Sequence, residues 1–113
     1  MHEMSIAESV LGIVEEAARR EGIGRVREVR LEIGQLAAIE VEALRFCFDA
    51  VVRGSVAEGA RLAIDEVPGS AWCFGCSETV ALAARGDACP RCGGGQLQVN
   101  GGTQMRVRDL LGN

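Results

Sequence analysis

The sequence predicts an α+β fold in which two helices pack on a three-stranded antiparallel sheet, with a zinc-ribbon-like four-cysteine domain inserted late in the chain. Three observations lead to this prediction. Apolar residues recur at helical spacing in two segments, they alternate with polar residues in three others, and a stretch rich in cysteine and glycine follows residue 70. The α+β domain is expected to span residues 1–68 and 101–113, and the cysteine domain residues 69–100.

The first helix is expected over residues 4–21, directly behind the only histidine of the chain, His2. Gly22 is expected to end it, because glycine is the usual residue just past a helix. The apolar face of this helix is expected to consist of Ile6, Val10, Ile13, Val14 and Ala17.

The other elements of the α+β domain are predicted from the same two patterns, helical spacing and strand alternation of apolar residues. A strand is expected at residues 25–33 (RVREVRLEI), where apolar and charged residues alternate. A second helix is expected from about residue 40 to 53, capped by Gly54. Strands are expected at 60–67 (ARLAIDEV) and at 103–109 (TQMRVRD). The apolar stripe of the second helix is expected to be Val41, Leu44, Phe48 and Val51, with Cys47 beside it.

Composition excludes several classes of function. The formal net charge is −4, all 12 basic residues are arginine, and they are interspersed with acidic residues. A nucleic-acid binder needs clustered positive charge, so this class is disfavoured. No apolar run approaches the length of a membrane-spanning helix and no signal peptide is visible, so we expect a cytoplasmic protein without a membrane partner.

The strongest motif is a pair of C-x2-C sequences separated by twelve residues, formed by Cys73, Cys76, Cys89 and Cys92. Two such turns facing each other supply four sulfurs to one tetrahedral ion, most simply zinc, with iron in a rubredoxin-like centre as the rival. Because protein sulfurs fill all four positions, the zinc is expected to be structural.

Residues around this motif suit a thiolate site. Gly75 and Gly93 tolerate the tight turns, and Arg85 and Arg91 are placed to offset the negative charge of the thiolates. The fifth cysteine, Cys47, is expected to be a small buried apolar residue. No base is placed beside it, and the sequence shows no second histidine and no open metal site, so we do not expect an enzyme.

The N-terminus offers a second set of ligands. A free α-amine, neighbouring backbone amides and the His2 imidazole lie within a few bonds of each other, and nitrogen donors in a tetragonal arrangement suit Ni(II) or Cu(II). The Glu3 carboxylate could add an oxygen donor or accept a hydrogen bond from the imidazole. Histidine at position two should protect Met1 from removal. The structural alternative is a solvated histidine at a frayed terminus.

These features together resemble the HypA/HybF family of nickel-incorporation proteins for [NiFe]-hydrogenase maturation. The resemblance covers essentially the whole chain and is carried by the MHEMSIAESV opening, the LEIGQL strand end, the paired cysteines and the closing MRVRDL strand. The opening Met1-His2-Glu3 in combination with the cysteine spacing is its most specific part.

The resemblance implies a nickel metallochaperone that binds Ni²⁺, its cargo, through Met1, His2 and Glu3, with backbone nitrogens among the donors. It implies structural Zn²⁺ on the four cysteines, and action with a HypB-type GTPase on the hydrogenase large-subunit precursor. Some family members also serve urease maturation. Some carry histidines near the cysteines, which this sequence lacks. The alternative reading is a zinc-ribbon module that binds protein or nucleic acid without a nickel function.

Overall fold

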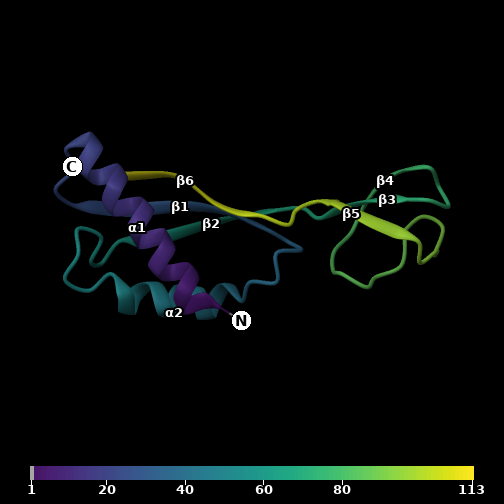
Figure 1. Cartoon of the computed structure of the whole chain (residues 1–113), viewed down its shortest axis with the longest axis horizontal. Coiled ribbons are helices and arrows are strands. Elements are labelled where there is room, and N and C mark those ends of the chain that lie inside the picture. The colour runs from purple at the N-terminus through teal and green to yellow at the C-terminus, as the bar shows by residue number, and fades with distance from the viewer. Residues whose placement is uncertain (1) are drawn as a thin grey trace. The chain divides into compact units, whose positions relative to one another are not determined.

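The computed structural model describes residues 2–113; the expected ligand Met1 lies outside the described residues. The elements follow in the order α1 (Glu3–Glu21), β1 (Val26–Gly34), α2 (Val41–Val51), β2 (Arg61–Val67), β3 (Ser70–Cys73), β4 (Glu78–Ala81), β5 (Leu97–Gly101) and β6 (Met105–Gly112) (Figure 1). The two expected helices and three expected strands are present within a few residues of their predicted bounds. The additional strands β3, β4 and β5 lie in the cysteine-rich segment.

The contacts within the chain divide it into two compact units. Residues 2–31, Ile39–Asp65 and Arg106–Asn113 form one, here called the helical unit. Glu32–Ala38 and Glu66–Met105 form the other, here called the cysteine unit. The domain boundaries expected from the sequence stay a prediction, and the compact cysteine unit reaches beyond them by including Glu32–Ala38.

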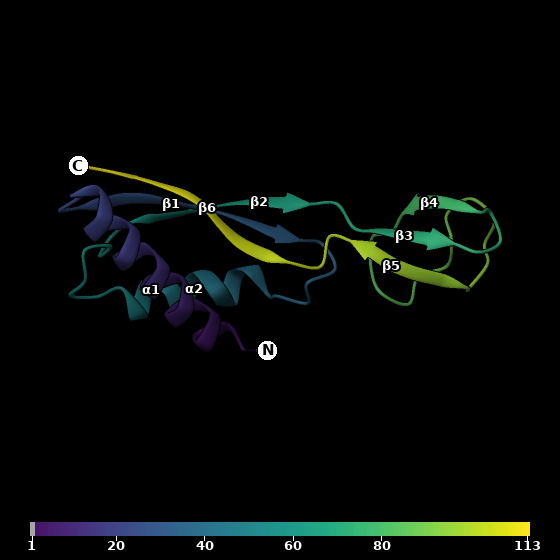
Figure 2. The same ribbon diagram turned by 45° about the horizontal axis from the view of Figure 1, so that its top comes forward.

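The first sheet has the strand order β2-β1-β6, with one parallel and one antiparallel pair of strands. The amide of Val26, at the start of β1, donates to Val56 O, and the amide of Gln35, just past its end, donates to Val67 O. The acceptor numbers rise with the donor numbers, as they do between parallel strands. Figure 2 shows the arrows of β1 and β2 pointing the same way and β6 running against them. The α+β class is confirmed, but the expectation that all three strands are antiparallel is wrong. Helix α2 returns the chain to the starting end of β1, so β2 begins there and runs parallel to it.

Helix α1 buries a stripe that differs in part from the predicted one. Its buried residues repeat at intervals of three and four: Glu3, Ala7, Val10, Val14 and Ala18. Ile13 was expected on this face but is 50% exposed. Gly22 ends the helix as expected, with a left-handed φ of 69° and an amide that donates to Arg19 O.

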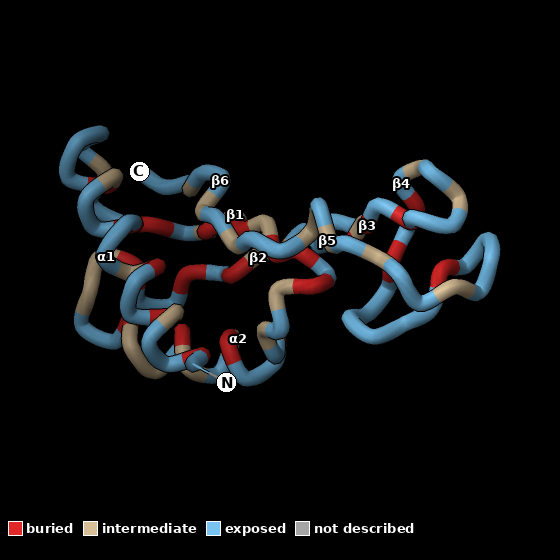
Figure 3. Tube along the Cα trace, turned by 45° about the vertical axis from the view of Figure 1, so that its right-hand side comes forward, coloured by how far each residue is buried: buried red, intermediate tan, exposed pale blue. Residues whose placement is uncertain are grey.

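Helix α2 packs against α1 through its own apolar stripe. Leu44 and Phe48 are fully enclosed and Cys47 is half-buried. Figure 3 shows buried stretches in red among exposed ones along both helices. The expected cap at Gly54 is wrong: the C-cap is Val52, and Gly54 takes its φ of 78° in the following turn. No helix among residues 2–113 is long and apolar enough to cross a membrane.

The cysteine unit is built on a second sheet with the order β4-β3-β5. Both pairings are antiparallel, with Trp72 opposite Thr79 on one side and Gln98 on the other. Leu36, Ala71 and Leu82 form one small core of this unit, and Cys73, Val80 and Cys89 form another. Because half-buried Leu97 packs against both, the two cores are continuous.

Three glycines allow three passes of the chain to meet in the cysteine unit. A Cβ atom on Gly34 would lie 2.2 Å from the carbonyl of Gly102, and one on Gly102 would lie 2.6 Å from Gly69 Cα. At this junction Leu36 N–H donates to Gly102 O and Gly69 N–H donates to Gln35 Oε1. These bonds explain why residues 32–38 belong to the cysteine unit.

This close approach predicts the result of two alanine substitutions. Gly102 and Gly86 both have positive φ, 73° and 91°, but only Gly102 is crowded, since a Cβ on Gly86 meets nothing within 4 Å. Gly86→Ala is expected to lower the free energy of unfolding by about 1–2 kcal/mol, the cost of a left-handed alanine. Gly102→Ala adds a backbone collision and is expected to cost clearly more. Urea titration followed by Trp72 fluorescence measures both, and equal losses would show that the junction is not tightly packed.

Candidate metal centres

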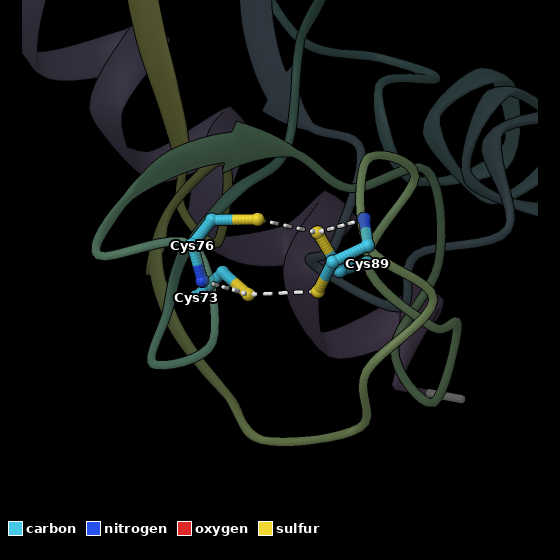
Figure 4. Close-up of side chains that lie close together, drawn as sticks. Cys73, Cys76 and Cys89 are labelled. Carbon is cyan, nitrogen blue, oxygen red and sulfur yellow. Dashed lines mark hydrogen bonds between the residues drawn. The ribbon is translucent and has the colours of Figure 1, made fainter.

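The structure brings together the four cysteines that the sequence singled out. Cys73 ends β3 and Cys76 lies in the turn after it, while Cys89 and Cys92 lie in the loop between β4 and β5. Their four sulfur atoms all lie within 4.8 Å of one another, and Figure 4 shows the two pairs facing each other. Among residues 2–113 this is the only group of three or more histidine, cysteine or carboxylate side chains close enough to share one ion.

The sulfur spacing fits a tetrahedral metal ion. The Sγ atoms of Cys73 and Cys92 are 3.6 Å apart, and those of Cys76 and Cys89 are 3.8 Å apart. A tetrahedron with Zn–S bonds of about 2.3 Å has sulfur–sulfur edges of about 3.8 Å. All five cysteines are free, and the spacing is far too long for a disulfide.

Backbone amides converge on the sulfurs. The amide of Cys76 donates to Cys73 Sγ at 3.4 Å, and the amides of Arg91 and Cys92 donate to Cys89 Sγ at 3.4 and 3.5 Å. Gly94 N–H donates to Cys92 Sγ, and a Cβ on Gly94 would approach that sulfur to 3.2 Å. The local turns therefore direct partial positive charge toward the place where thiolates would form.

The same contacts separate the thiol pKa values. The amides of Cys92 and Arg91 outweigh burial and lower the pKa of Cys89 to about 6. A hydrogen bond with Cys92, together with burial, raises the pKa of Cys76 to about 12. Four thiols this close cannot all ionise in the absence of a cation, because each thiolate disfavours the next. A divalent ion at the centre supplies the charge that makes four thiolates compatible.

The two arginines expected near this cluster have partners of their own. Arg91 pairs with Glu78 Oε1 at 2.7 Å, and Arg85 Nε donates to Leu36 O at 3.2 Å. Arg91 contributes to the cluster through its amide. Arg85 instead ties the Leu36 carbonyl to the segment after β4 within the cysteine unit.

His2 lies at the N-cap of α1 with its side chain exposed. Its carbonyl accepts from Ile6 N–H at 2.9 Å, and its imidazole makes no capping bond. Helical hydrogen bonding thus uses the carbonyl of His2 and leaves the ring facing water.

Glu3, the neighbour of His2, faces the other way. Its side chain is only 6% exposed, and its Oε2 accepts from Glu40 N–H at 2.9 Å. The N-terminal ammonium and this amide hold the pKa of the Glu3 carboxyl at about 2. Sequence reasoning missed the buried position of Glu3 and the part played by Glu40. The available signal was the spacing of Glu3, Ala7 and Val10, which extends the buried stripe of α1 back to its first turn.

Comparison with known proteins finds a family model that matches nearly the whole chain. A family model described as "Hydrogenase/urease nickel incorporation, metallochaperone, hypA" matches residues 1–111. A protein of Azotobacter vinelandii named hydrogenase maturation factor HypA is 60% identical over 110 residues, covering 97% of each chain. A protein of the same name from Azoarcus sp. (strain BH72) is 59% identical over 110 residues, covering 97% of this chain and 96% of its own.

A solved structure supports the fold. The solution structure of the Ni metallochaperone HypA from Helicobacter pylori aligns with a TM-score of 0.69 at 24% identity, covering 99% of this chain and 97% of that one.

Zinc dependence is testable with two serine variants. Cys73→Ser removes one sulfur of the four and is expected to reduce bound zinc from one ion per chain to almost none after dialysis against a mild chelator. Cys47→Ser, the matched control, is expected to keep its zinc, because Cys47 lies on α2 outside the cluster. The zinc content of both purified proteins is measured, and Trp72 fluorescence shows whether the cysteine unit stays folded. Full zinc retention by Cys73→Ser, or iron as the resident metal, would contradict the expectation.

Proposed function

This chain belongs to the HypA family of hydrogenase/urease nickel-incorporation metallochaperones, and we propose that it binds Ni(II) through Met1, His2 and Glu3 and passes the ion on. The single observation that carries the proposal for this chain is the exposed imidazole of His2 at the very start of α1. Copper(II) favours the same kind of donors, so the family is what selects nickel.

The start of a helix suits a site made of main-chain nitrogens. The first turns of a helix contain N–H groups that have no intrahelical acceptor. In α1 the Ile6 N–H donates to His2 O. The nitrogens of residues 2 and 3 take no part in that bond, so a metal ion can bind them without breaking it. A tetragonal set of nitrogen donors is the arrangement that Ni(II) prefers.

For the four cysteines we propose a structural zinc site. The sulfur spacing, the amides directed at the sulfurs and the absence of an open position among the four ligands support it. Bound zinc would keep all four thiols ionised and tie the two cysteine turns of the unit together.

The proposed activity is transfer, not catalysis. A donor set at a chain end, with one side-chain ligand, is less enclosed than a cage, so nickel can leave when a better site is offered. Proton uptake by the imidazole or the amides favours release, because these ligands bind metal only when deprotonated. We propose a HypB-type GTPase and the hydrogenase large-subunit precursor as partners, with urease maturation proteins as further recipients, and a cytoplasmic location.

Nickel titration of His2→Ala tests the proposal. Removing a residue that only hydrogen-bonds to a metal ligand typically weakens metal binding by roughly 10- to 100-fold. Because the imidazole is itself a proposed ligand, its loss is expected to weaken Ni(II) binding by more than that. Helix content and zinc occupancy should stay unchanged, because the ring makes no capping bond and lies outside the cysteine unit. If the variant keeps its zinc and binds nickel as tightly as the wild type, the proposal is wrong and the alternative, a zinc-ribbon module without a nickel function, is favoured.

A one-residue extension tests the α-amine separately. Glycine added before Met1 moves the terminal amine out of register with His2 while leaving every side chain in place. The nickel absorption spectrum is expected to change and the affinity to fall. An identical spectrum would show that the amine is not a ligand.

A further inference from the structure

We propose that the Glu3 carboxylate positions the nickel ligands and is not itself one of them. Through its hydrogen bond to the Glu40 amide it fixes the first turn of α1 against the start of α2, and so holds the nitrogen donors around His2 in register. The inference rests on the proposed nickel binding at the N-terminus.

Burial separates the roles of the two neighbours. Glu3 is the one buried polar or charged residue among residues 2–113, whereas His2 is exposed. A carboxylate in that position belongs to the packed stripe that continues through Ala7 and Val10. A side chain that binds and releases an ion has to be accessible to solvent. The imidazole of His2 is exposed, whereas the carboxylate of Glu3 is buried.

The Glu3 carboxylate takes the place of a missing cap on α2. Glu40 is the N-cap residue of α2, and its own side chain makes no capping bond. In a capping box, a glutamate from the third helical residue accepts from the N-cap amide. Here a glutamate from another helix does so at 2.9 Å, and its charge is also favoured by the positive end of the α2 dipole. One bond thus serves the ends of two helices.

The link from this bond to nickel affinity is conformational. The first residues of a chain fray unless something ties them down. When only a fraction of the molecules has the binding geometry, the apparent affinity falls by that fraction. If loss of the Glu3 bond leaves one molecule in ten competent, nickel binds about tenfold more weakly with every ligand atom still present.

The first test compares Glu3→Gln with Glu3→Ala. Glutamine keeps an oxygen that can accept from the Glu40 amide, but it lacks the charge that makes a carboxylate a nickel ligand. Glu3→Ala is expected to weaken nickel binding about tenfold, and Glu3→Gln to recover most of that loss with an unchanged nickel absorption spectrum. Equal losses, or a changed spectrum for Glu3→Gln, would identify the carboxylate as a ligand.

The second test removes the donor and leaves Glu3 untouched. Glu40 has φ of −80°, which proline can adopt, so Glu40→Pro deletes the amide hydrogen with little backbone strain. Glu40→Ala is the matched control, because it loses the same carboxylate but keeps the amide. We expect the affinity loss to be confined to the proline variant. An equal loss in both would assign the effect to the Glu40 side chain and overturn the proposal.

A measurement without nickel separates this inference from the proposed function. In zinc-loaded protein free of nickel, the Glu40 amide is expected to exchange its hydrogen slowly in wild type and Glu3→Gln, and faster in Glu3→Ala. Uniform exchange in all three would refute the anchoring contact itself. If exchange behaves as expected but His2→Ala binds nickel like wild type, the anchor stands and the nickel assignment fails.

Discussion

The meeting of four sulfur atoms is the constraint on which the cysteine unit depends. Its apolar core is small, and two of the three buried residues in the cluster that contains Val80 are the cysteines Cys73 and Cys89 themselves. Modules of this size rarely stay folded on apolar burial alone and commonly use a metal or disulfides. Two of the four metal-site cysteines are therefore also part of the hydrophobic core of this unit. The helical unit has no such need, since two amphipathic helices cover one face of its sheet.

The sequence predicted the elements of the helical unit well, because helical and strand periods are local properties of the chain. It failed where a long-range choice was needed. The strand–helix–strand order of residues 25–67 is typical of a parallel pair with a crossover helix, yet the short three-stranded sheet was expected to be antiparallel. Strand direction depends on where α2 returns the chain, which no single segment encodes.

The candidate sites divide in the same way. The cysteine spacing alone located the four-sulfur cluster, because two residues between ligands already define a turn around an ion. The donor atoms of Met1, His2 and Glu3 predicted a metal site at the N-terminus, but the sequence did not reveal that the His2 side chain is exposed and the Glu3 side chain buried. Their directions follow from the phase of α1, and the predicted face was rotated toward Ile13. Had the stripe joined Ala7 and Ala18 to Val10 and Val14, in place of Ile6 and Ile13, Glu3 would have fallen inside it.

The junction of Gly34, Gly69 and Gly102 has a consequence for how this protein can evolve. When two side chains collide, a smaller residue on one side usually relieves the clash. Here a Cβ on Gly34 or Gly102 meets only backbone atoms, and one on Gly69 meets the backbone carbonyl of Leu82 as well as the Leu36 side chain. Backbone atoms cannot be made smaller by substitution. A substitution at any of the three has no single compensating change among the other two. Sequence drift should therefore be slower at these positions than at many residues that lie closer to the metals.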